Sequence, residues 1–387
     1  MDWPKTADVV VVGGGVMGAS IAYHLARKGC ENVVLLERHP LFGQEATGKC
    51  AGGIRYQFAT EINIRLSLLS LPMLDRFEDE LGQAIDRRRC GYLFLLTREE
   101  DVRAFRANVA LQHRLGVMTE WLTGDQARAR LPLMRLDDVL AATWHASDGL
   151  ADPNGVVQGY VAGARRLGAR CLIKTEVTGI RVDASRGRVR GVQTSAGEIA
   201  TPVVVNAAGP WAAQIGAMAG VEMPVVPVRR QIFVTTPVPQ LPPDFPFVID
   251  FARNLYLHRE GPGVLTGMSN LNEPPGFDQR VDPEWELDHI DAVMARMPLL
   301  EEVGISSRWA GLYEVSPDAH PILGKAPDVD GFYCINGFSG HGLMHAPACG
   351  LLLAEEILDG KAHTLDITSL SLGRFREGKL ILEYNVV

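Results

Sequence analysis

Closely spaced cysteine pairs are absent from this 387-residue sequence. Its six cysteines are Cys30, Cys50, Cys90, Cys171, Cys334 and Cys349, and no two form a CxxC motif. This scatter excludes the usual zinc motifs and a dense disulfide framework, and it favours a reducing compartment. We therefore expect a cytoplasmic protein without a metal site.

Long apolar runs are also missing. No stretch reaches the roughly 20 apolar residues that a membrane-spanning helix requires. Residues 1–8 are short and polar, which leaves no room for the apolar core of a signal peptide. We expect no membrane span, and peripheral membrane contact stays open.

Positive charge is in deficit, with 38 Lys and Arg against 46 Asp and Glu and a net charge of −8. Nucleic-acid binding depends on clustered basic residues, so a nucleic-acid partner is not expected. The 47% hydrophobic and 22% charged content is that of an ordinary globular protein, long enough for two domains.

The first apolar segment has the pattern of a βαβ unit. The β-branched run Val9–Val12 ends in a glycine-rich turn, and helical apolar spacing then continues to Lys28. A second buried strand is predicted at 33–36, directly before Glu37.

This unit carries a dinucleotide-binding fingerprint. Gly13 allows a tight turn, Gly15 lets the backbone approach a pyrophosphate, and Gly18 lets helix and strand pack closely. The helix N-terminus adds partial positive charge for the phosphates, and Glu37 can accept bonds from both ribose hydroxyls. The fingerprint serves FAD and NAD alike, so it predicts an adenosine cofactor without a 2′-phosphate.

The remaining pattern predicts an α/β protein, α+β overall, in which a nucleotide-binding domain is interrupted by pieces of an antiparallel-sheet domain. Helices are expected at 61–81, with a kink at Pro72, at 99–115 and from Asp152 to about 167. Strands are expected at 92–96, 171–173, 203–205, 231–234, 255–258 and 264–266, with a hairpin or meander at 177–200.

Three further segments, Ala46–Phe58, Asn206–Trp211 and Gly337–Met344, resemble the flavoprotein family of D-amino-acid oxidase, glycine oxidase and sarcosine oxidase. The first of these segments, taken together with Gly311–Asp318, looks most like the β subunits of L-proline dehydrogenase and sarcosine oxidase. The resemblance implies a Rossmann-type FAD-binding domain at 1–87, 148–222 and 306–387. It implies a substrate-binding domain at 88–147 and 223–305.

The third segment favours FAD over NAD on physical grounds. Its glycines and the start of a helix running to about Leu358 give oriented N–H groups and positive potential. Such a site stabilises the negative charge of reduced flavin. In the family, these groups point at the N1–C2=O edge of the flavin.

The expected FAD contacts follow from the fingerprint and the resemblance. They are Gly13, Gly15, Val16, Met17, Gly18, Glu37, Arg38, Thr47, Gly48, Lys49, Cys50, Ala51, Gly52, Val177, Ala208, Gly209, Trp211, Gly311, Gly337, Ser339, Gly340, His341, Gly342, Leu343 and Met344.

Departures from the family refine this expectation. Gly311 and Cys50 stand where relatives with covalent flavin carry the attaching cysteine or histidine, so we expect non-covalent FAD. Met344 and Leu265 replace two lysines of monomeric sarcosine oxidases, one for substrate binding and one for oxygen activation. A dehydrogenase is therefore favoured. The electron acceptor stays open and could be oxygen, a quinone or a redox partner. Assembly into homo- or hetero-oligomers also stays open.

Four residues are predicted to act on a small amino acid or amine whose C–N bond is oxidised by hydride transfer to flavin N5. Arg55 would bind a substrate carboxylate bidentately, or else pair with a structural carboxylate. Tyr313 would lie over the flavin, and Tyr256 and His258 would share one strand face in the pocket roof.

Two other functions fit parts of the pattern. A pyridine-nucleotide dehydrogenase would share the first motif but would not need the Gly337–Met344 turn. A non-catalytic flavoprotein serving as an assembly or scaffold factor would retain both the first motif and the Gly337–Met344 turn.

Overall fold

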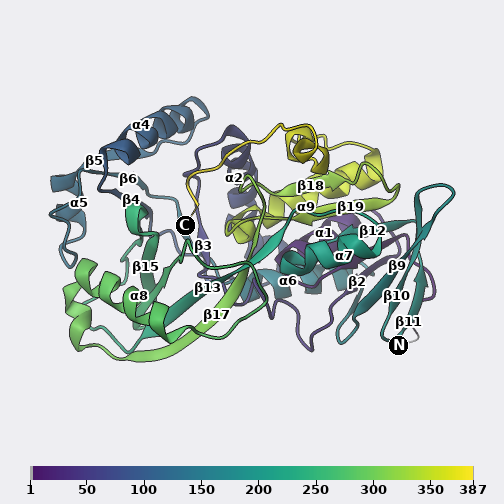
Figure 1. Cartoon of the computed structure of the whole chain (residues 1–387), viewed down its shortest axis with the longest axis horizontal. Helices are drawn as coiled ribbons and strands as arrows, with labels where there is room; N and C mark the ends of the chain where they lie inside the picture. The colour runs from purple at the N-terminus through teal and green to yellow at the C-terminus, as the bar shows by residue number, and fades with distance from the viewer. Residues whose placement is uncertain (1–2, 387) are drawn as a thin grey trace.

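The computed structural model describes residues 3–386, which form two sheet-based bodies joined side by side (Figure 1). The first contains a six-stranded sheet in the order β18-β19-β12-β1-β2-β8, parallel except for the β18–β19 pair. Its strands are β1 (Val9–Val12), β2 (Val33–Leu36), β8 (Arg170–Leu172), β12 (Val203–Asn206), β18 (Ile322–Lys325) and β19 (Phe332–Asn336).

Both faces of this sheet are covered, because successive residues of its central strands are apolar and point to opposite faces. Val9 and Val11 face a core that includes α1, α6 and α9, while Val10 and Val12 face the meander and α7. The first-face helices are α1 (Val16–Arg27), α2 (Glu61–Asp75), α3 (Phe77–Leu81), α6 (Pro153–Arg166) and α9 (Gly342–Asp359). The second face carries α7 (Ala212–Met218), β9 (Val177–Asp183), β10 (Arg188–Thr194) and β11 (Gly197–Ala200).

The second body contains an eight-stranded sheet in the order β17-β13-β16-β15-β14-β4-β6-β5, with one parallel pair, β14–β4. Its strands are β4 (Tyr92–Leu96), β5 (Glu120–Thr123), β6 (Ala141–His145), β13 (Val226–Thr235), β14 (Phe247–Asp250), β15 (Leu255–Glu260), β16 (Gly263–Met268) and β17 (Ile305–Val315). Helices α4 (Glu99–Arg114), α5 (Gly124–Arg130) and α8 (Pro283–Arg296) accompany it. A short strand, β3 (Gly53–Ile54), pairs with β7 (Gly149–Leu150).

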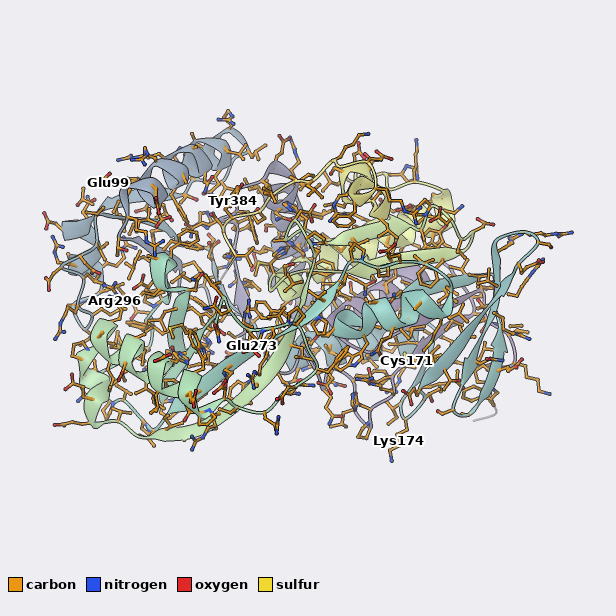
Figure 2. All side chains as sticks on the ribbon, viewed as in Figure 1. Glu99, Cys171, Lys174, Glu273, Arg296 and Tyr384 are labelled. Carbon is orange, nitrogen blue, oxygen red and sulfur yellow. The ribbon has the colours of Figure 1, made fainter. Side chains whose placement is uncertain are left out.

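A buried ion pair fixes α8 on this second sheet. Arg296, labelled in Figure 2, donates to Asp250 at the end of β14, with its Nη2 2.6 Å from the Oδ2 atom. Both side chains are almost fully buried, so loss of Asp250 would leave the buried guanidinium with only the half-exposed Asp138 as an ionic partner.

The interleaved α/β architecture is confirmed, including the predicted meander and the helix that Asp152 caps. Two details differ. The predicted helix at 61–81 breaks at Arg76 rather than at Pro72, which lies inside α2. Strand β17 pairs with β13 along its length, so it lies in the eight-stranded sheet rather than with the nucleotide-binding segments as predicted. Within residues 3–386, no helix is both long enough and apolar enough to cross a membrane.

Candidate active site

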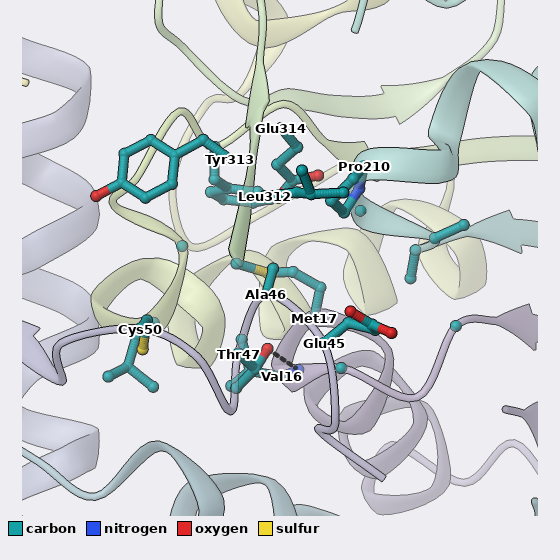
Figure 3. Close-up of a pocket in the computed structure, with 18 of the residues that line it drawn as sticks. Val16, Met17, Glu45, Ala46, Thr47, Cys50, Pro210, Leu312, Tyr313 and Glu314 are labelled. Atoms are coloured by element: carbon teal, nitrogen blue, oxygen red, sulfur yellow. Dashed lines mark hydrogen bonds between the residues drawn. The ribbon is translucent and has the colours of Figure 1, made fainter. Parts of the chain in front are cut away.

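The first glycine-rich turn joins β1 to α1 and is closed by backbone contacts. A Cβ atom at Gly18 would lie 1.8 Å from the carbonyl oxygen of Gly13, so only glycine allows this packing. At Gly15 the nearest atom to such a Cβ is the hydroxyl oxygen of Thr47, at 3.3 Å. That hydroxyl accepts a hydrogen bond from the Val16 N–H at 3.1 Å (Figure 3). The Val16 N–H is thus engaged within the protein, and the start of α1 borders the pocket, where its partial positive charge favours a phosphate.

Glu37 follows β2 and lies beside the same turn. Its carboxylate accepts the N–H groups of Gly14, at 2.8 Å, and His39, at 2.7 Å. The side chain lines the pocket, and Arg38 stacks on the Trp211 ring nearby, with 3.9 Å from Cζ to the ring centroid. An oriented carboxylate beside a glycine-rich turn fits an adenosine ribose with free hydroxyls.

The second glycine-rich turn precedes α9. Gly340 has a φ of +97°, and a Cβ there would lie 2.4 Å from the Tyr313 ring, so the turn requires glycine. The Gly337 N–H donates to the Glu314 carboxylate at 3.1 Å. Burial raises the pKa of Glu314 to about 7, against weaker opposing hydrogen bonds from the Gly337 and Phe338 backbone.

Both turns line one pocket, whose empty space, including its open mouth, is about 1780 Å³. Its lining joins the fingerprint turn at Gly13 to the turn before α9 and to Arg55, so both predicted segments border the same space. The predicted meeting of the two distant segments is therefore confirmed. Pocket-lining residues among the predicted FAD contacts are Gly13, Gly15, Val16, Met17, Glu37, Arg38, Thr47, Cys50, Ala51, Gly52, Val177, Ala208, Gly209, Trp211, Gly340, His341, Gly342, Leu343 and Met344.

Six predicted contacts are not part of this lining, namely Gly18, Gly48, Lys49, Gly311, Gly337 and Ser339. The glycines support the turns by close packing, as at Gly48, where a Cβ would lie 2.4 Å from the Gly43 carbonyl oxygen. Lys49 donates to the Glu45 carboxylate at 3.0 Å, and Ser339 accepts the Ser316 N–H at 3.2 Å.

Arg55 lines the part of the pocket that borders the eight-stranded sheet, and it is 5% exposed. Its guanidinium donates to the main-chain carbonyls of Gln57 and Asn385 and lies over the Phe58 ring, 3.9 Å from its centroid. Within residues 3–386, no carboxylate forms a salt bridge with it. Burial lowers the pKa of Arg55, a shift that the more distant Tyr92 and Glu383 oppose.

Aromatic side chains form most of the surroundings of this end. Tyr92, Tyr256, Tyr313 and Phe247 all line the pocket, and burial raises the pKa of each of the three tyrosines. These hydroxyls are therefore neutral donors and acceptors at ordinary pH.

His258 differs from Tyr256, although both rings stack on Phe247, with centroid distances of 5.0 and 5.6 Å. His258 is not part of the lining, and its Nδ1 contacts the Arg259 carbonyl oxygen at 2.9 Å. Burial lowers its pKa to about 4. The shared strand face is confirmed, but the structure places only Tyr256 at the pocket.

His341 and His345 form a buried pair, with 3.2 Å between their Nδ1 atoms. Burial lowers the pKa of His341 to about 4 and that of His345 well below its ordinary value. The remaining ring nitrogens contact the Ala319 carbonyl at 3.0 Å and the Ser67 hydroxyl at 3.1 Å. No cluster of three or more metal-ligating side chains occurs in the part of the chain that the structure describes.

Cys50 lines the pocket, and burial raises its pKa to about 11. Its thiol is therefore protonated near neutral pH and is a weak nucleophile toward a neighbouring ring.

Several lining residues were not predicted, chiefly Tyr92, Phe247, Glu314 and Val386. Tyr92 and Phe247 belong to neighbouring strands of the eight-stranded sheet, where strand alternation alone does not tell which face is covered. Glu314 follows the predicted Tyr313 directly, and an acidic residue at the end of the run Trp309–Tyr313, which carries no charge, was a usable signal.

Comparison with known proteins agrees with this geometry. The family model described as FAD dependent oxidoreductase matches residues 8–356. Human mitochondrial sarcosine dehydrogenase is 32% identical over 96% of this chain, which spans only 42% of that protein's length. The FAD-dependent oxidoreductase domain-containing protein 1 of Xenopus laevis is 32% identical over 99% of this chain and 85% of its own.

Among solved structures, L-proline dehydrogenase from P. horikoshii superposes with a TM-score of 0.91 and 34% identity. That match covers 98% of this chain and 100% of the other.

Proposed function

The chain belongs to the family of FAD-dependent oxidoreductases, and we propose that it oxidises the C–N bond of a small secondary or N-methylated amino acid. This family assignment excludes the pyridine-nucleotide alternative. FAD, when bound, supplies the two-electron acceptor for a hydride from the substrate carbon. Sarcosine dehydrogenase and L-proline dehydrogenase, two similar proteins, are named for substrates of this class.

The observation that carries the proposal is Arg55. A buried guanidinium whose partners are neutral carbonyls retains its charge, and burying an unpaired charge is costly. A substrate carboxylate would supply the missing anion and would be held in the planar geometry that a guanidinium favours. Such binding orients the adjacent α-carbon.

The other groups at this end favour a neutral amine. The pKa shifts of Tyr256, Tyr313 and His341 all favour uncharged forms, because burial penalises charge. The same surroundings would lower the pKa of a substrate ammonium, and only the neutral amine has an electron pair available to assist hydride loss. The chain thus contributes orientation and exclusion of water rather than a nucleophile.

We further propose that FAD is held without a covalent bond, since glycine occupies position 311 and the Cys50 thiol is protonated. Leu265 is buried in β16 and supplies no charge for oxygen activation, which favours transfer of electrons to a quinone or a redox partner.

Anaerobic reduction of the purified yellow protein tests this function. The protein is titrated separately with sarcosine, dimethylglycine, proline and glycine. At least one of these amino acids should bleach the flavin absorbance. A matched set without the carboxylate, such as pyrrolidine for proline, should be much poorer. Failure of every amino acid and amine to bleach the flavin would instead favour a non-catalytic assembly factor.

A further inference from the structure

Glu383 is a buried carboxylate, 6% exposed, held at the N-terminal end of α2. Its Oε1 accepts the N–H groups of Ala59 and Asn385, at 2.9 and 3.0 Å. Its Oε2 accepts the Thr60 N–H at 3.2 Å, the Thr60 hydroxyl at 2.7 Å and the Asn63 amide at 3.0 Å. Burial opposes ionisation, but these donors, led by Thr60, more than offset it and lower the pKa of Glu383.

Two residues further along, the same segment reaches Arg55. The Arg55 Nη2 group donates to the Asn385 carbonyl, and the next residue, Val386, lines the pocket. Figure 1 shows this part of the chain, in yellow, crossing from the side of α9 and β18 toward β3. Glu383 therefore anchors the segment immediately before its contact with the predicted carboxylate-binding residue.

Hydrophobic packing contributes little to this anchoring. Leu382 and Tyr384, which flank Glu383, are 48% and 66% exposed, and Figure 2 labels Tyr384. The inward residues are Glu383 and Asn385, as expected for extended backbone. Other polar ties hold the segment further back, where the Glu383 N–H donates to the Asp318 carbonyl at 3.2 Å and the Ile381 N–H to its carboxylate at 3.4 Å.

The contact with Asn385 fixes the orientation of Arg55. A guanidinium has five N–H groups. Gln57 and Asn385 each accept one of them, and the Phe58 ring supports one face of the plane. Neutral carbonyls do not cancel the charge, so Arg55 retains three N–H groups and a positive charge that can attract an anion.

We propose that Glu383 is a positioning residue for substrate binding: it anchors residues 383–386 so that the Asn385 carbonyl aims Arg55 at a substrate carboxylate. The assignment rests on the proposed function, in which Arg55 binds that carboxylate. It assigns Glu383 no contact with substrate or flavin.

The test compares Glu383→Ala with Glu377→Ala in the FAD-loaded protein. Glu377 is an exposed carboxylate just upstream that pairs with Lys379 at 2.7 Å, so its variant controls for general loss of charge. Acetate is titrated against each protein and followed by the change in flavin absorbance, with Arg55→Met showing which part of the response depends on Arg55. The KM and kcat for proline and pyrrolidine are then measured.

Glu383→Ala should raise the acetate dissociation constant and the KM for proline by about tenfold, a typical effect of losing charged hydrogen bonds. The kcat for proline and both constants for pyrrolidine should stay within about threefold, because the amine lacks the group that Arg55 binds. Glu377→Ala should behave as the wild type. Glu383→Gln retains acceptor oxygen and should rescue part of the loss.

Unchanged acetate affinity in FAD-loaded Glu383→Ala, or equal losses with proline and pyrrolidine, would overturn the assignment. If Glu383→Ala does not fold, Glu383→Gln, which conserves the shape of the side chain, replaces it in the test. Wild-type affinity for acetate in Glu383→Gln would then overturn the assignment. Absence of an Arg55-dependent acetate response in the wild type also overturns it. Acetate binding needs no turnover, so a lack of flavin reduction by amino acids would refute the proposed function alone.

Discussion

The dinucleotide end and the substrate end of the pocket are built in different ways. At the dinucleotide end, the glycine-rich turns and the starts of α1 and α9 present backbone N–H groups. At the substrate end, side chains from β4, β15, β17 and the segment before α2 converge on Arg55. One end depends on backbone shape and the other on side-chain chemistry. Substitutions should therefore separate cofactor retention from substrate selection.

The largest expected effect comes from a substitution that disrupts only the dinucleotide end of the pocket. Gly18→Ala places a Cβ 1.8 Å from the Gly13 carbonyl oxygen, and backbone atoms there cannot move aside cheaply. We expect a loss of several kcal/mol, about 3 or more, and purification of protein with little flavin. Flavin content per chain measures this. Gly276→Ala, where a Cβ would meet no atom within 4 Å, is the control, and equal flavin in both variants would contradict the assignment.

The next largest effect is expected from a substitution that disrupts only the substrate end of the pocket. Arg55→Met keeps most of the side-chain volume but removes the charge, so kcat/KM for a carboxylate substrate should fall about 100-fold, or roughly 3 kcal/mol. Flavin content should be unchanged. Arg106→Met is a matched control, because Arg106 also stacks on an aromatic ring, Trp121 at 3.7 Å, but lies outside the pocket lining. Wild-type kinetics in Arg55→Met would defeat the proposed function.

Glu314 also belongs to the pocket lining, and its raised pKa predicts how the folding stability of the protein depends on pH. A carboxyl whose pKa rises from 4.5 to about 7 on folding binds its proton more tightly in the folded state, so folding stability falls as pH rises from about 4.5 to 7. Glu314→Gln cannot ionise and should become more stable than the wild type by about 1–3 kcal/mol above pH 7. Melting temperatures of both proteins from pH 5 to 8.5 measure this, and a constant difference would contradict it.

The smallest effect distinguishes two residues of one strand. Tyr256→Phe removes a hydroxyl in the pocket and should lower kcat/KM by about fivefold, or 1 kcal/mol. His258→Gln alters a ring outside the lining and should leave kcat/KM within about twofold in protein that folds. The reverse ranking in steady-state kinetics would show that His258, not Tyr256, faces the substrate.

Prediction from the sequence placed residues correctly in the pocket lining where the site is built from contiguous backbone. Gly13, Gly15 and Glu37 occupy fixed places in a βαβ unit, so their spacing alone indicated their use. The Asn385 carbonyl contacts Arg55 across 330 residues, and a main-chain oxygen leaves no mark in the residue type. Similarly, alternation placed Tyr256 and His258 on one face, but only packing decides which part of that face borders the pocket.

The strand order of the six-stranded sheet has a consequence for synthesis of the chain. A nascent chain that has emerged as far as β8 can pair β1 with β2, yet the other edge of β1 has no partner until β12 appears. An unpaired, all-valine edge strand is a site for aggregation. We therefore expect the growing polypeptide to depend on chaperones over this interval, and to acquire its flavin only after the last third has left the ribosome.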